Sequence, residues 1–96
     1  MNNRGLDVVR DIAKKKGIKG DINISNAKSK RFNIRVDGVL INFGLWPYSG
    51  NGTFIDHHDK NIREAWRARH SKIMKNGKPA YLDKSSPEFY SWNLLW

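Results

Sequence analysis

Histidines and carboxylates gather in one short segment of the chain. Asp56, His57, His58 and Asp59 are consecutive, and His70 follows further along. Imidazole nitrogens beside carboxylates are the ligand types that bind Zn²⁺ and similar cations. We therefore take Asp56, His58 and Asp59 as candidate metal ligands, and His58 and His70 as candidate catalytic groups. The spacing matches no diagnostic metal motif, so either carboxylate can equally cap a helix. No other cofactor is indicated.

Basic side chains are the second chemical feature. The 96 residues include 18 Lys and Arg against 9 Asp and Glu, which gives a formal net charge of +9. Cations that neutralise phosphates release counterions, so this surplus favours nucleic acid as the partner. The residues predicted to bind its phosphates are Lys14, Lys15, Lys16, Arg35, Arg63, Arg67, Arg69 and Lys72. The alternative is a solvated basic face without a ligand.

Arg69 differs from the other cations in its expected position. Projected at 100° per residue, it falls within the apolar arc of its helix, between Ile62 and Ile73. A cation there must reach solvent or meet an anion. It therefore forms a structural ion pair, with an aspartate or the terminal carboxylate as partner, or it lines a pocket and binds phosphate or carboxylate.

The composition excludes several classes of protein. There is no cysteine, so disulfides and thiolate chemistry are ruled out. No apolar run approaches the length of a membrane span, and the first residues lack the apolar core of a signal peptide. We expect a protein that is neither secreted nor in a membrane.

A β-hairpin is the clearest local pattern. Apolar and polar residues alternate over 32–36 and again over 39–43, with Asp37-Gly38 between them. An Asp-Gly pair between alternating strands is a strong hairpin signal. A two-residue turn pairs Val36 with Val39 and Phe32 with Phe43, which puts the main apolar set on one face.

Helices surround this hairpin in the predicted order of elements. Helical periodicity is present over 5–16 and 59–75, and a capped start at Ser85 opens a last helix over 87–96. A short strand over 21–25 and a Gly- and aromatic-rich loop over 44–55 complete the chain. The sequence thus predicts one α+β domain over residues 1–96, a small antiparallel sheet packed with N-terminal, central and C-terminal helices.

Several short motifs together resemble a known group of proteins. Phe43-Gly44, Thr53 before the Asp56–Asp59 run, Arg69-His70 and the terminal Trp-Asn-Leu-Leu-Trp are the matching elements. This pattern resembles a family of small uncharacterised proteins of large DNA viruses and phages, over roughly residues 31–96. The resemblance implies a viral source, and with it a location in a virion or in the interior of an infected cell. It also places Asp56, His58, Asp59, Arg63, Arg69 and His70 together.

Three functions follow as expectations. The first is a non-enzymatic viral or phage protein that binds nucleic acid, DNA in preference to RNA, through backbone phosphates. The second is a minor virion protein that contacts coat proteins through Tyr90, Trp96 and the loop over 45–54. The third is a metal-dependent nuclease built on Asp56, His58, Asp59 and His70.

Overall fold

The predicted hairpin forms two of the three strands of the main sheet. In the computed structural model, which describes residues 3–48 and 50–96, strand β2 spans Lys30–Val36 and strand β3 spans Val39–Leu45. Val36 pairs with Val39, Ile34 with Ile41 and Phe32 with Phe43, which confirms the predicted register. Asp37 and Gly38 both have positive φ, the geometry of a type I′ turn.

One more strand and the first helix complete the N-terminal half. Strand β1, Asp21–Ile24, pairs antiparallel with β2, so the strand order is β1-β2-β3. Helix α1 spans Leu6–Lys16 and ends at Gly17, whose N–H donates to the last carbonyls from a left-handed conformation. The predicted helix and short strand are both confirmed.

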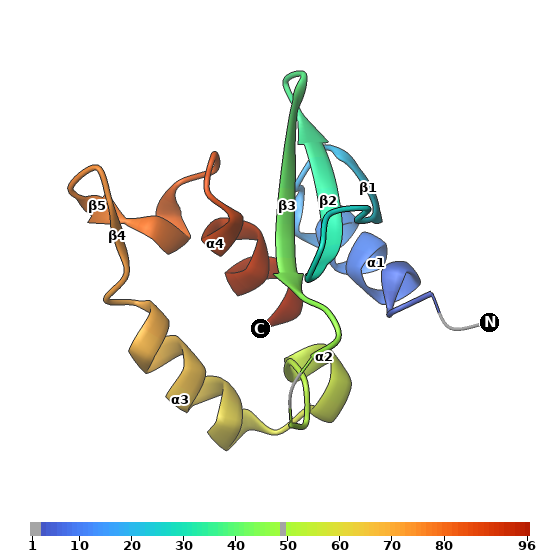
Figure 1. Cartoon of the computed structure of the whole chain (residues 1–96). Coiled ribbons are helices and arrows are strands. Elements are labelled where there is room, and N and C mark those ends of the chain that lie inside the picture. Colours follow the sequence, from blue (N-terminus) through green and yellow to red (C-terminus); the bar gives the residue numbers. More distant parts are fainter. Residues whose placement is uncertain (1–2, 49) are drawn as a thin grey trace.

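A single apolar core joins the sheet to helices from both ends of the chain. Its buried members are Val9, Ala13, Ile22, Phe32, Ile34, Ile41, Phe43, Tyr90, Leu94 and Leu95. They come from α1, from all three strands and from the C-terminal helix. The α+β class predicted from the sequence is therefore confirmed, with α1 and the C-terminal helix packed against the core of the sheet (Figure 1).

The C-terminal helix exposes a different face from the one its sequence predicts. It comprises α4, Pro87–Tyr90, and a π-helical segment η2, Ser91–Leu95, and its cap is Ser86 rather than Ser85. A π-helix brings residues four and five apart onto one face. Tyr90, Leu94 and Leu95 consequently face the core together, whereas α-helical projection places Tyr90 and Leu94 opposite Leu95.

The central helix ends earlier than predicted. Helix α3 spans Lys60–His70, and a small hairpin of β4, Met74–Lys75, and β5, Lys78–Pro79, replaces its expected last turn. Asn76-Gly77 is the turn of this hairpin, with positive φ at both residues, and not a helix stop. A 3-10 turn η1, Ala80–Leu82, follows, and the predicted loop over 44–55 ends in a short helix α2, Phe54–His57.

Helix α3 lies apart from the sheet and contacts the C-terminal helix through aromatic rings (Figure 1). The ring of Trp66 lies parallel to that of Trp96 at 4.7 Å and close to that of Trp92 at 5.8 Å. We call these three tryptophans the aromatic seam. Ala65, which helical projection places with Ile62 and Trp66, is exposed on α3. Ile73 lies beyond the end of the helix and is 42% exposed.

Among residues 3–48 and 50–96, no helix combines the length and the apolar character needed to cross a bilayer.

Candidate nucleic-acid interface

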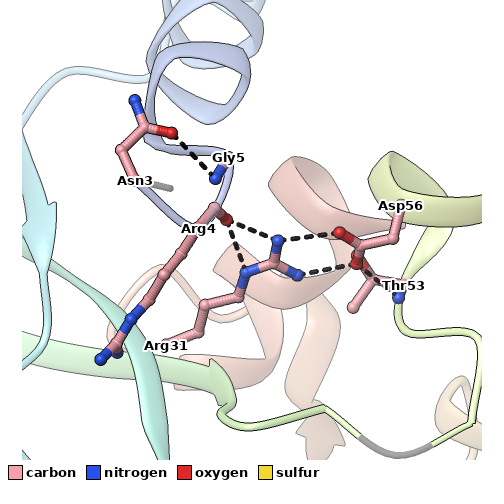
Figure 2. A network of polar contacts seen from close by, with 6 residues as sticks. All are labelled: Asn3, Arg4, Gly5, Arg31, Thr53 and Asp56. Atoms are coloured by element: carbon pink, nitrogen blue, oxygen red, sulfur yellow. Dashed lines mark hydrogen bonds and ion pairs between the residues drawn. The ribbon is translucent and has the colours of Figure 1, made fainter. Parts of the chain in front are cut away.

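One arginine of the sheet is fully withdrawn from the surface. Arg31 is 2% exposed, and its guanidinium lies between the carbonyl oxygen of Arg4 and the carboxylate of Asp56 (Figure 2). Nη1 and Nη2 lie 2.8 and 2.9 Å from the two carboxylate oxygens. Arg31 is therefore a structural cation that joins the segment before α1 to β2 and α2, and its guanidinium is not available to a ligand.

Asp56 is held in the ionised form by this network. Burial by itself raises the pKa of Asp56, but hydrogen bonds from Arg31 and from the backbone and hydroxyl of Thr53 outweigh it and lower the pKa. Both of its oxygens accept from protein donors. This carboxylate is committed to the fold rather than free to bind a metal.

The other predicted metal ligands have separate roles. His58 is exposed and ends α2 in a left-handed conformation, while Asp59 caps α3 by accepting from the backbone of Asn61 and Ile62. Within the described part of the chain, no three His, Asp or Glu side chains are grouped so that they could hold a metal ion. The hypothesis of a metal site at Asp56, His58 and Asp59 gains no geometric support.

His70 is paired with a carboxylate that the sequence did not single out. Its Nδ1 lies 2.6 Å from Oε1 of Glu88, and its ring stacks on Trp66 at 3.9 Å. The structure thus separates His70 from Asp56 and His58, with which it was grouped. The spacing of Ser85 and Glu88 predicts a capping box between them, but the Glu88 carboxylate contacts His70 instead and the helix cap is Ser86.

The lysines at the end of α1 divide into two kinds. Lys14 is exposed, and Lys15 forms an exposed ion pair with Asp11 at 2.9 Å. The ammonium of Lys16 instead donates to the carbonyl oxygen of Asn93, at 2.6 Å, in the C-terminal helix. Lys16 is the member of this cluster that the fold holds in place.

Helical projection places Arg63 and Arg67 on the side of α3 away from Ile62 and Trp66, but in the structure both side chains pack over aromatic rings of neighbouring elements. The guanidinium of Arg63 lies over Phe54, 4.5 Å from the ring centroid, and that of Arg67 lies over Trp92 at 5.1 Å. Both side chains are half-buried. Their Nε atoms are buried, and no acceptor among the described residues is hydrogen-bonded to them.

The two basic regions of the sequence meet at these residues. Partial burial lowers the pKa of Lys16, and the positive charges of Arg67 and Arg63 lower it further. Burial also lowers the pKa of Arg67, again with a contribution from Arg63. Lys16 donates to the carbonyl oxygen of Asn93 and Arg67 lies over the ring of Trp92, so these two cations contact adjacent residues of the C-terminal helix. Arg63 lies one turn before Arg67 on α3. Lys16 of α1 and the two arginines of α3 therefore form one cluster.

Few carboxylates oppose this cluster. Glu64 is 71% exposed, lies 3.8 Å from Arg63 and partly offsets the shift of the Arg67 pKa. No carboxylate among the described residues forms an ion pair with Lys16 or Arg67. The local field is consequently positive.

A hollow beside Lys16 extends the positive region across the end of the sheet. Its volume is about 590 Å³, and its basic lining residues are Lys16, Lys19, Arg35 and Lys84, with Asp37 as the acidic one. We call these four residues, with Arg63 and Arg67, the basic surface. Lys19 and Lys84 were not among the predicted residues, because only the fold brings 16–20, 35–37 and 84–93 together.

A further donor lies next to this cluster. The Nδ1 of His57 accepts from the backbone N–H of Asp59 at 2.8 Å, so the proton of a neutral ring is on Nε2. That Nε2 is buried and has no hydrogen-bond partner among the described residues. The His57 ring lies 5.5 Å from Trp96 and 6.1 Å from Phe54, the ring beneath Arg63.

Two predicted residues lie elsewhere. Arg69 is exposed and lines a separate pocket between α3, the sheet and the C-terminal helix, without an ion pair to any described residue. Of the two alternatives for Arg69, the structure favours a pocket residue over a structural ion pair. The structural ion pair with an aspartate is made by Arg31 instead. Lys72 is exposed in the turn after α3 and does not line the basic surface.

Comparison with known proteins adds nothing to this description. The fold and site define a small α+β domain with a basic surface. No protein-family model matches the chain, and neither curated proteins nor solved structures give a match.

Proposed function

We propose that the protein binds nucleic acid through the phosphate backbone, with the basic surface as its contact. The observation that carries this proposal is the convergence of Lys16, Arg63 and Arg67 from two helices, where Lys16 and Arg67 contact the adjacent residues Asn93 and Trp92 and little charge opposes them. Phosphate oxygens would accept from the guanidinium groups and offset the mutual repulsion of these cations.

Unused donors support an anionic ligand in particular. Buried polar groups are normally hydrogen-bonded, yet the Nε atoms of Arg63 and Arg67 form no hydrogen bond to a described residue, and Glu64 Oε1 lies 3.8 Å from Arg63 Nε, beyond hydrogen-bond distance. Stacking on Phe54 and Trp92 fixes the planes of the two guanidinium groups. Cations held in this way lose little side-chain entropy on binding.

The proposal is non-enzymatic and specifies no base sequence. Contacts to phosphates position a protein on nucleic acid without reading bases. We expect DNA to be the preferred polymer. A virus or phage as the source, and a virion or infected-cell location, remain predictions based on the resemblance described above.

The test is a salt titration of DNA and RNA binding. We expect the logarithm of the affinity to fall linearly with the logarithm of salt concentration. The double variant Arg63→Gln/Arg67→Gln should reduce this slope by about 2, since each lost phosphate contact changes it by about 1. The control is Lys28→Gln/Lys78→Gln, which removes the same charge outside the basic surface.

Two results would contradict the proposal. One is an affinity that does not weaken with salt. The other is an equal loss of affinity and slope in both double variants, which would show that net charge alone drives binding.

A second candidate function is contact with another protein. Ile73, Met74 and Leu82 are 42%, 57% and 61% exposed around the β4–β5 hairpin. Tyr90, one of the residues first expected to make such a contact, is 2% exposed. Sedimentation of wild-type protein and of Met74→Ser/Leu82→Ser tests this candidate, which predicts self-association or capture of a coat protein by the wild type alone.

A further inference from the structure

The pocket lined by Arg69 has the features of a small-ligand site. Its volume is about 590 Å³, within the usual range for such sites, and it opens between α3, the β2–β3 sheet and the C-terminal helix. Its walls combine aromatic rings with two basic side chains. The basic surface does not include these residues.

The two cations of this pocket are available to an anion. Lys30 of β2 and Arg69 of α3 are both exposed, and neither side chain is hydrogen-bonded or ion-paired to a described residue. The acidic lining residue is Glu88, which is engaged by His70 at 2.6 Å. The carboxylate is therefore directed to the imidazole, and the positive charge of Lys30 and Arg69 is left uncompensated.

Stacked rings form the aromatic wall of the pocket. Trp66 is buried and its ring is parallel both to His70 at 3.9 Å and to Trp96 at 4.7 Å. Tyr48 contributes a ring that is 40% exposed. A planar heterocycle can pack against such rings, because aromatic side chains accept any base by stacking.

We infer that this pocket binds a nucleotide that carries a phosphate monoester. The phosphate is bound by Arg69 and Lys30, and the base packs against Tyr48 and Trp96. A guanidinium suits a phosphate because its donors match two oxygens at once. The inference rests on the proposed function in one respect only: the nucleotide is either free or the phosphorylated end of a strand bound at the basic surface.

Calorimetric titration of the whole protein tests the pocket directly. The ligands are adenosine monophosphate, adenosine and inorganic phosphate. We expect the monophosphate to bind about tenfold or more tightly than either part alone, because each part makes only one of the two kinds of contact. Equal affinity for the monophosphate and adenosine, or no binding of the monophosphate, would overturn the inference.

A matched pair of variants locates the site. Arg69→Gln should weaken binding of the monophosphate about tenfold, the loss expected for a charged hydrogen bond. Lys72→Gln, an exposed neighbour outside the pocket, should leave it unchanged. Both variants should retain the melting temperature of the wild type, because neither side chain is packed. Equal weakening by both variants would overturn the assignment to this pocket.

Oligonucleotides distinguish the two sources of the nucleotide. If strand ends are bound, a 5′-phosphorylated DNA oligomer binds more tightly than its 5′-hydroxyl form, and Arg69→Gln abolishes the difference. If free nucleotides are bound, the monophosphate competes with neither oligomer and the difference is absent. Salt-dependent DNA binding without any monophosphate binding would overturn this inference and leave the proposed function intact. Monophosphate binding without DNA binding would overturn the proposed function and leave this inference intact.

Discussion

The guanidinium of Arg31 joins strand β2 to helix α2, with Nη1 and Nη2 2.8 and 2.9 Å from the two carboxylate oxygens of Asp56. The same group donates to the carbonyl oxygen of Arg4, so three distant segments depend on one side chain. Because α2 leads directly into α3, this pair also fixes where the helix that carries Arg63 and Arg67 begins.

Loss of the Asp56 charge should destabilise the protein strongly. Asp56→Asn leaves the buried guanidinium of Arg31 without its counter-charge, and we expect it to lower the free energy of unfolding by about 3 kcal/mol. Asp11→Asn removes an exposed ion pair instead and should lower it by less than about 1 kcal/mol. Urea denaturation measures both values. Equal losses would show that the Arg31–Asp56 pair adds nothing beyond a surface contact.

Acid should act through the same carboxylate. The pKa of Asp56 is lower in the folded protein than its ordinary value of 3.8, so the folded state binds this proton less readily than the unfolded state. The stabilisation is complete above that ordinary value and is lost as the pH falls through the lower, folded pKa. Urea midpoints measured from pH 6 to pH 2 should therefore converge for the wild type and Asp56→Asn. A constant difference between them would contradict this account.

Gly44 should tolerate substitution less well than Gly17, although the two glycines have similar backbone angles. Gly44 and Gly17 have φ of 81° and 70°, so alanine is strained at both by about 1 kcal/mol. A Cβ at Gly44 would also lie 3.0 Å from Leu95 Cδ1 and 3.1 Å from Arg31 Cβ, whereas one at Gly17 meets nothing within 4 Å. We expect Gly44→Ala to cost about 2 kcal/mol more than Gly17→Ala in thermal unfolding. Equal costs would mean that this contact relaxes freely.

The hydroxyl of Tyr90 should matter to stability below alkaline pH. It donates to the carbonyl oxygen of Lys84 at 2.6 Å, and Tyr90→Phe should cost about 1 kcal/mol. Burial raises the pKa of Tyr90, with a contribution from the charges of Asp37 and Asp83. The neutral form therefore stabilises the fold below the ordinary pKa of 10.0, and this stabilisation is lost as pH rises through the folded pKa. Tyr48→Phe, at an exposed site, is the control in pH-dependent unfolding and should show neither effect.

The sheet and first helix could be predicted because their signals are local. The Asp37-Gly38 turn fixes the register of the hairpin, and the alternation of Phe32, Ile34 and Val36 assigns its buried face. The end of α3 could not be assigned in the same way. Asn76-Gly77 is both a helix-ending and a hairpin-forming signal, and tertiary contacts select the hairpin.

The candidate site was predicted only in part. Arg63, Arg67 and Lys16 are in the predicted set, but their proximity depends on how α1, α3 and the C-terminal helix pack. The burial of Arg31 and the exposure of Arg69 are both the reverse of what the sequence pattern predicts. Helical projection assigned burial to Arg69, whereas Arg31 alternates outward from Phe32 and is buried because Gly44 and α2 cover that side of the sheet. The alternation of residues along a strand does not indicate whether another segment packs over its outward face.

The aromatic seam provides a fluorescence signal from the contact between α3 and the C-terminal helix, separate from the core of the sheet. Trp66, Trp92 and Trp96 lie where α3 meets the C-terminal helix, while the buried core of the sheet contains phenylalanine, tyrosine and aliphatic residues. The fourth tryptophan, Trp46, lies after β3 beside Tyr48. In a Trp46→Phe variant, tryptophan emission therefore follows the docking of α3, and amide hydrogen exchange in β2 and β3 follows the sheet. Coincident transitions would define a single cooperative unit. Loss of the emission signal before exchange begins in the sheet would make α3, which carries Arg63 and Arg67, a separate folding unit.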